Sequence, residues 1–298
     1  MDQQNRYLDD ERRDRGGKLL NVLGVLTVIV VATLVVFAVV PDMRSLLPGP
    51  RAAAYPTQTL PDGISATSSQ SAAPVDQADP FAGTAAAKYP KGAAGITLPP
   101  AKAVKGFTAK EVDAALKKVR AAMIAGRLDH AMLVDHKTAK FLGLLAPRSR
   151  KDIDGWFKKD EFSSIATWIA PTAKLDPKAQ PRVSGRITYS SRVVDKIQTL
   201  QVTTNFVWVY AFTGADRPIV VAHDELRWEF PDPDNLYPED RGMWLAESKS
   251  YSYGMDCTAI AKGMLAPGRP KIVGPTETTD PDALLRPDHT LEIGDDCP

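Results

Sequence analysis

Hydrophobic residues are concentrated in one uninterrupted run near the N-terminus. Leu19 to Val40 covers 22 residues and contains no charged side chain. As a helix rising about 1.5 Å per residue, it would span about 33 Å, which matches a bilayer hydrocarbon core of about 30 Å. Water cannot satisfy backbone groups inside a bilayer, so a single spanning segment is expected to be helical. The pattern predicts a transmembrane helix over residues 19–40, with membrane lipid as its partner.

A cleaved signal peptide is the alternative interpretation of this run. The stretch is longer than the apolar region of about 7–15 residues that signal peptides carry. Pro41 follows it directly, where a cleavage site with small residues would be expected. We therefore expect this segment to remain in the mature protein as an anchor.

Basic residues beside the run predict its orientation, because Lys and Arg are retained on the cytoplasmic side. Two follow the run closely, and five precede it: Arg6, Arg12, Arg13, Arg15 and Lys18. Residues 1–18 are thus predicted to form a cytoplasmic tail. The rest of this single-pass protein is predicted to lie outside the cell membrane.

Composition separates the predicted anchor from the residues that follow. Residues 41–105 contain ten prolines and few large apolar side chains, so they are predicted to form a disordered linker. Residues 268–298 carry seven acidic and three basic residues, and are predicted to form a solvated, Pro-rich acidic tail. The whole chain has a formal net charge of +1, which does not indicate a nucleic-acid partner.

A helical period appears after the linker. Thr108 and Glu111 have the spacing of a capping box, in which each side chain bonds the other residue's backbone N–H. Gly126 is expected to end this helix. Its predicted buried face consists of four apolar residues spaced by three or four: Val112, Leu116, Val119 and Met123.

Two shorter helices and then four strands are expected further along. The helices are predicted over His136–Leu145, ending before Pro147, and over Lys151–Phe162. After residue 181 the hydrophobic period falls from about 3.6 to two, which is typical of half-buried strands in an antiparallel meander. We predict an α+β domain over residues 106–267, with helices packed on one face of a curved sheet. The expected strands are Arg182–Val193, Ile197–Thr213, Ile219–Phe230 and Met243–Tyr253.

This element order, from Phe107 to Tyr253, resembles the NTF2-like fold of the SnoaL and ketosteroid-isomerase type, in which helices close over a curved sheet to form a cone. With the anchor and linker, the chain also resembles uncharacterised single-pass membrane proteins of actinobacteria with an extracytoplasmic NTF2-like domain. It is similar in the same way to Mce-associated membrane proteins and to the bitopic assembly factors of type IV secretion systems. In those bitopic groups, the resemblance implies a protein-contact or scaffolding role.

The two cysteines, Cys257 and Cys297, both lie on the predicted outer side of the membrane. An exported location permits a disulfide, which would tie the acidic tail to the domain. Two free thiols or a redox pair are the alternatives, although redox pairs normally lie close together in sequence. We therefore predict a structural disulfide.

Asp224 is the one candidate for acid–base chemistry. It falls between Ala222 and Leu226 on the apolar face of its predicted strand, where desolvation would raise its pKa toward that of a general base. Glu247 on the neighbouring strand could share that face. The alternatives are that a bulge turns Asp224 outward, or that it bonds a nearby arginine or backbone group.

No metal, cofactor or phosphate-loop pattern is found. The four histidines, His130, His136, His223 and His289, lack the spacing of metal ligands, and we expect His223 to point away from the apolar face. The acidic loop at residues 232–235 is better explained as turn chemistry than as a calcium loop. A row of arginines on the outer strand face could contact an anionic partner, or form an ordinary solvated face: Arg182, Arg186 and Arg192.

These observations lead to one expected function and two alternatives. We expect a membrane-anchored extracytoplasmic domain that binds or scaffolds an envelope protein or cell-wall partner, without catalysis. The first alternative is a small-ligand carrier or acid–base enzyme that uses the interior of the cone. The second is a subunit of an envelope secretion or transport complex.

Overall fold

The computed structural model of the chain describes residues 79–214, 216–268, 282–291 and 297. All of them belong to the second of two compact units, Ser71–Pro298. The predicted cytoplasmic tail, the predicted transmembrane helix over residues 19–40 and the predicted linker as far as residue 78 lie outside the described residues. Within the described part of the chain, every helix is too short or too polar to cross a membrane.

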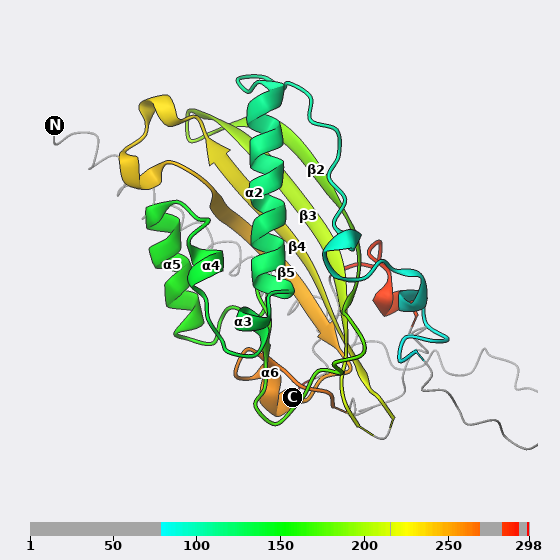
Figure 1. Cartoon of the computed structure of the whole chain (residues 1–298). Coiled ribbons are helices and arrows are strands. Elements are labelled where there is room, and N and C mark those ends of the chain that lie inside the picture. The colour runs from blue at the N-terminus through cyan, green and yellow to red at the C-terminus, as the bar shows by residue number, and fades with distance from the viewer. Residues whose placement is uncertain (1–78, 215, 269–281, 292–296, 298) are drawn as a thin grey trace, which may run out of the picture. The chain divides into compact units, whose positions relative to one another are not determined.

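Four long strands form one antiparallel sheet, which confirms the predicted meander (Figure 1). The strands follow one another in space as they do in sequence, and their bounds differ from the predicted ones by at most two residues. A β-bulge shifts the register of the last pair between Arg227 and Trp228. The strands are β2 (Arg182–Val194), β3 (Ile197–Ala211), β4 (Ile219–Pro231) and β5 (Trp244–Tyr253). A second, two-stranded parallel sheet pairs β1 (Trp168–Ile169) with β6 (Met264–Leu265).

The first predicted helix is α2 (Ala109–Arg127), and it begins as the sequence indicates. The Thr108 hydroxyl accepts from the backbone N–H of Glu111, and the Glu111 carboxylate accepts from that of Thr108, so the capping box is complete. The four apolar residues predicted to be buried are at most 3% exposed. The helix continues one residue past Gly126, and Arg127 therefore lies on this same buried face.

The predictions for the next two helices were partly wrong. Only the short helix α4 (Ala139–Leu142) lies within the range expected over His136–Leu145, and another short helix, α3 (His130–Leu133), precedes that range. His136 adopts φ = 55°, in the left-handed region, which a continuous helix does not allow. The helix expected over Lys151–Phe162 is α5 (Pro147–Phe157), which begins four residues and ends five residues earlier than predicted. Pro147 begins it, because a proline is tolerated at the first helical position, where no N–H is needed. The last helix is α6 (Cys257–Ile260).

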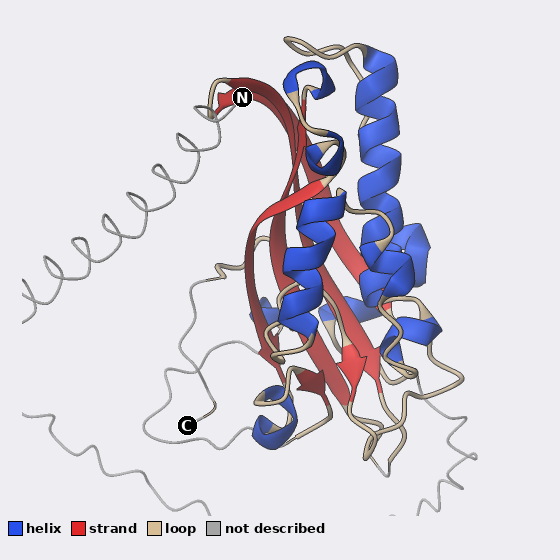
Figure 2. Ribbon diagram, turned by 90° about the vertical axis from the view of Figure 1, so that its left-hand side faces the viewer, coloured by secondary structure: helices blue, strands red, loops and turns tan. Residues whose placement is uncertain are grey.

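Helices cover one face of the curved sheet, and the main core lies between these layers (Figure 2). Aromatic side chains from β3 and β4 fill the centre of this inner face, and Trp208 and Trp228 have no exposed surface. Phe141 from α4 packs edge-on against Trp228, with ring centroids 6.4 Å apart. The described residues thus confirm a mixed α+β domain with an antiparallel sheet of four strands.

A second core covers one end of the opposite, outer face. Phe81 and Leu285 pack there against apolar residues of β3 and β4, among them Val207, Val209 and Val221. Phe81 belongs to the segment predicted to be linker, and Leu285 to the predicted solvated tail. The ordered domain therefore extends beyond residues 106–267, because this end of the sheet presents apolar side chains on both faces.

Short 3-10 helices in these two segments lie side by side (Figure 1). They are η1 (Ala85–Lys88) and η2 (Gly92–Gly95) before α2, and η5 (Ala283–Leu285) near the C-terminus. Asp282 accepts from the backbone N–H of Ala85, and the Tyr89 hydroxyl donates to the carbonyl of Leu285. The loop between β4 and β5 holds two more, η3 (Pro233–Asn235) and η4 (Pro238–Asp240).

The predicted disulfide is confirmed between Cys257 and Cys297, whose Cα atoms are 5.4 Å apart. It joins α6 to the end of the chain across a sequence separation of 40 residues. The bond therefore ties the C-terminal segment to the domain, as the positions of the cysteines suggested.

Candidate functional site

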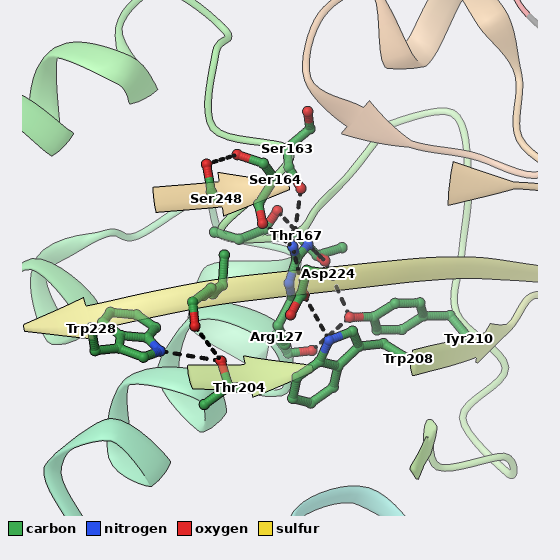
Figure 3. A network of polar contacts seen from close by, with 12 residues as sticks. Arg127, Ser163, Ser164, Thr167, Thr204, Trp208, Tyr210, Asp224, Trp228 and Ser248 are labelled. Carbon is green, nitrogen blue, oxygen red and sulfur yellow. Dashed lines mark hydrogen bonds and ion pairs between the residues drawn. The ribbon is translucent and has the colours of Figure 1, made fainter. Parts of the chain in front are cut away.

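Asp224 lies on β4 and points into the main core, where its carboxylate forms an ion pair with Arg127 (Figure 3). Arg127 Nη2 and Asp224 Oδ2 are 2.9 Å apart, and the two side chains are 2% and 1% exposed. Trp208 Nε1 donates to the same carboxylate oxygen at 2.8 Å. An arginine partner is one of the alternatives that the position of Asp224 on its strand allows, and Asp224 lies beside Arg127.

The guanidinium of Arg127 also binds the chain segment between α5 and β1. Its Nη1 donates to the carbonyl of Ala166 at 2.8 Å and to the hydroxyl of Thr167 at 2.9 Å. Its Nη2 donates to the carbonyls of Ser163 and Ser164, at 3.1 and 2.8 Å. Arg127 therefore connects the end of α2, this segment and the sheet through one buried charge (Figure 3).

Tyr210 completes the buried network. Its hydroxyl donates to the carbonyl of Arg127 at 3.0 Å and lies 3.1 Å from the hydroxyl of Thr167. Burial raises the pKa of Tyr210 to about 12, so its hydroxyl stays protonated and able to donate. These contacts are those of a structural network, in which nearly every polar group is hydrogen-bonded inside the protein.

The electrostatics of Asp224 reflect two opposing effects. Burial raises the pKa of its carboxyl group to about 6, while the charge of Arg127 and the hydrogen bonds from Trp208 and Arg127 lower it. Asp224 Oδ1 and Arg127 Nε are buried without a hydrogen-bond partner among the described residues. A carboxylate with such a pKa suits proton transfer, but a substrate would have to reach it through the packed inner face.

Glu247 does not share a site with Asp224. In the register of β4 and β5, Asp224 pairs with Ser250, whereas Glu247 pairs with Arg227. Glu247 accordingly lies on the outer face, where its carboxylate is 2.5 Å from Arg227 Nη1. The two acidic groups therefore face opposite sides of the sheet.

His223 lies on the outer face, as expected, but it has no exposed surface. Its Nε2 is 3.0 Å from Asn205 Oδ1, and its ring packs edge-on against Tyr251 with centroids 5.1 Å apart. Tyr251 in turn donates to the carbonyl of Leu284 at 2.7 Å and packs against His289. Burial lowers the pKa of His223 to about 4, so its ring is neutral near pH 7.

His130 and His136 do not form a shared site. His136 stacks on Trp168 with ring centroids 4.6 Å apart, and its Nε2 lies 3.0 Å from the carbonyl of Ile169. His130 is exposed at the start of α3. In the described ranges, no three acidic, histidine or cysteine side chains are arranged to hold a metal ion.

The three arginines of the predicted row do not share one exposed surface. Arg186 and Arg192 are exposed on the outer face of β2. Arg182 is instead mostly covered: its guanidinium lies 5.1 Å from the ring centroid of Phe81. It donates to the carbonyl of Tyr89 at 3.1 Å and pairs with Asp79 at 2.8 Å. The covering N-terminal segment thus removes Arg182 from the surface row.

Arg182 lines a basic cavity of about 320 Å³ instead. We use the name basic cavity for the hollow formed by three segments, at residues 79–91, 178–182 and 217. It receives four cationic side chains and one carboxylate, with apolar and amide groups completing its wall. Its lining residues are Asp79, Pro80, Phe81, Lys91, Lys178, Ala179, Gln180, Arg182 and Arg217. A smaller cavity on the outer face is lined by Thr203, Glu225, Arg227, Glu247 and Lys249.

Sequence reasoning missed Arg127, Trp208 and the basic cavity. The burial of Arg127 could have been predicted from its position, because it follows Met123 by four residues and so continues the buried face of α2. Trp208 could be placed on the inner face, but its contact with Asp224 depends on the register of β3 against β4. The basic cavity joins residues about 140 positions apart, and no local pattern indicates such a site.

The fold and the sites define a mixed α+β domain with a filled inner face and a basic cavity at its surface. In comparisons with protein-family models, curated proteins and solved structures, the chain matched none.

Proposed function

We propose that the chain is a membrane-tethered, extracytoplasmic binding domain that contacts an envelope partner and does not catalyse a reaction. The observation that carries this proposal is the location of Asp224, the one sequence candidate for catalysis. Its carboxylate is paired with Arg127 in the packed core, whereas the basic cavity offers charged groups at the surface. A binding function can use the accessible charged groups of the basic cavity. Catalysis would need the carboxylate of Asp224, which is buried.

The packed inner face favours a surface-binding function over the carriage of a small ligand inside the fold. An NTF2-like cone that carries a small molecule needs an open interior. We propose that this domain is an NTF2-like cone whose interior is filled by side chains. Phe206, Trp208 and Trp228 meet there without exposed surface. Neither cavity described above is lined by residues of this cluster.

Tethering follows from the N-terminal sequence. The run at residues 19–40 is proposed to hold the chain in the membrane, and the residues from 41 onward to lie outside. The disulfide between Cys257 and Cys297 is consistent with an oxidising compartment. A domain tethered in this way meets partners of the envelope.

Site-specific photo-cross-linking in cells that make the full chain tests the binding function. A photoreactive residue is placed at Gln180 beside the basic cavity, at Lys249 on the outer sheet face, or at Lys117 on the exposed side of α2. We expect at least one position to give a discrete, reproducible adduct with an envelope component, since a binding surface holds its partner in contact. Irradiation that yields no adduct at any of the three positions would contradict the proposal.

A further inference from the structure

We propose that residues 282–291 form a strap on the outer sheet face, and that this strap detaches in acid when His223 beneath it takes up a proton. The strap contains η5, drawn in red in Figure 1. Its Leu285 packs on the apolar end of the outer face, against a cluster that includes Val207 and Val221. Detachment would therefore uncover apolar sheet residues. It is a change within the domain and does not depend on the proposed binding function.

The strap is held by tyrosines that belong to other segments. The hydroxyl of Tyr251 on β5 donates to the carbonyl of Leu284 at 2.7 Å, and that of Tyr89 donates to the carbonyl of Leu285 at 2.8 Å. Leu284 and Leu285 are 7% and 3% exposed. The disulfide at Cys297 keeps the end of the chain attached to α6, so the strap stays linked to the domain when it detaches.

Tyr251 connects the strap to His223. The ring of His223 packs edge-on against that of Tyr251, with centroids 5.1 Å apart, and has no exposed surface. On its other side, Tyr251 packs against His289 of the strap, with centroids 5.9 Å apart. One side chain thus contacts the buried imidazole and also donates the hydrogen bond that holds Leu284. A change in the charge of His223 acts directly on this contact.

The hydrogen bonds of His223 leave no acceptor for a second proton. The Nδ2 group of Asn205 donates to the carboxylate of Glu225 at 3.2 Å, so Asn205 Oδ1 is the atom that faces the imidazole. This oxygen can only accept, and His223 Nε2 therefore carries the proton and donates to it at 3.0 Å. His223 Nδ1 is buried without a partner among the described residues. Protonation at Nδ1 would bury a cation that neither water nor a protein acceptor stabilises.

Charged groups from the neighbouring elements modify this effect without cancelling it. Burial is the main cause that lowers the pKa of His223 to about 4, and the charges of His289 and Arg186 lower it further, whereas Asp288 on the strap opposes them. Burial also raises the pKa of Tyr251 to about 12, so its hydroxyl remains a donor. Once the strap detaches, water reaches the imidazole and its pKa returns toward 6.5. Below pH 6.5 the detached state binds a proton that the attached state does not, so acid favours detachment.

Hydrogen-exchange mass spectrometry of the full-length protein in nanodiscs, at pH 7.5 and pH 5, tests the proposal. Protection factors remove the pH dependence of the exchange chemistry itself. The reporters are the amides of the strap and the amide of Ala85, which donates to Asp282. We expect their protection to fall at least tenfold at pH 5, on the order that the two pKa values of His223 imply. The amides of α2 should stay better protected than the strap at both pH values, because the strap opens while the domain remains folded.

Variants assign the response to one histidine. His223→Gln should keep the same strap protection at both pH values, since glutamine does not titrate. Asn205→Asp is a second variant: a carboxylate beside Nε2 would stabilise the protonated ring under the attached strap, so the response should shrink. His130→Gln is the matched control, because His130 is exposed on α3, and it should respond as the unmodified protein does.

Three results would overturn the proposal. The first is equal strap protection at pH 7.5 and pH 5 in the unmodified protein. The second is strap protection equal to that of α2, which would show that the strap opens only when the whole domain unfolds. The third is a response that persists in His223→Gln or disappears in His289→Gln, which would assign the titrating group to another residue.

Discussion

Replacing Arg127 with methionine is expected to lower the free energy of unfolding by about 3–5 kcal/mol, because it leaves Asp224 buried without its cation. The substitution also removes the donors that the carbonyls of Ala166, Ser163 and Ser164 accept from. Each buried acceptor left without a partner adds to the loss. Chemical denaturation of the purified domain, monitored by tryptophan fluorescence, measures the change.

The pH dependence of this effect distinguishes a lost ion pair from lost packing. Without the charge of Arg127, which lowers the pKa of Asp224, that pKa should rise further above its value of about 6. Asp224 in the variant then takes up a proton as the pH falls below neutral, and the deficit should shrink at pH 5. Arg192→Met is the control, because Arg192 is exposed on β2, and it should cost less than about 0.5 kcal/mol. A deficit for Arg127→Met as small as the control's would show that the network does not stabilise the fold.

The second large effect is a loss of stability in acid that depends on His223. Burial lowers the pKa of this histidine from 6.5 to about 4 in the folded protein. Below pH 6.5 the unfolded chain binds a proton at this position and the folded protein does not, so stability falls as the pH falls. The loss should reach about 2 kcal/mol by pH 5 and about 3 kcal/mol near pH 4, at 1.36 kcal/mol per pKa unit.

The measurement compares the protein with His223→Gln at pH 8 and pH 5, because other groups titrate in the same range. Asp224 has the opposite sign: its raised pKa makes the folded state take up a proton first, which adds stability as the pH falls through 6. His289, Arg186 and Asp288 lie near enough to influence His223. These groups are present in both proteins, so their contributions largely cancel in the difference. Parallel pH profiles for the two proteins would refute the assignment to His223.

The sheet and the first helix could be predicted because their signals are local. The alternation along β2, β3 and β4 fixes which side chains share a face, and the capping residues of α2 mark where it begins. The same local rules failed at His136, whose left-handed backbone is held by the stack on Trp168 and by the carbonyl of Ile169. Contacts from another part of the chain override the helical pattern there.

The order of residues 79–105 could not be predicted from composition. Phe81 lies in a stretch rich in alanine, glycine and proline, and its burial depends on the apolar end of the outer sheet face. That end is itself visible in the sequence, where Val207 and Val209 interrupt the polar positions of β3. A strand that is apolar on both faces requires a cover, but the sequence does not say which segment supplies it.

The candidate site also combines features that have local sequence signals with features that depend on the tertiary fold. Asp224 was placed correctly on the apolar face by the period of its strand, and an arginine partner was among the alternatives. Which arginine it is depends on how α2 packs across the sheet, a three-dimensional relation without a local signal. The basic cavity could be predicted even less from the sequence, since it forms only when residues 79–91 fold against the start of β2.

Protease treatment of intact cells that make the full chain tests most directly whether this domain is tethered outside the membrane. We expect protease to cut between residues 41 and 78 and to release a folded domain, while a membrane-bound fragment keeps residues 1–40. A domain that is digested only after the cells are lysed would contradict this topology. So would a mature chain whose first residue lies beyond Val40.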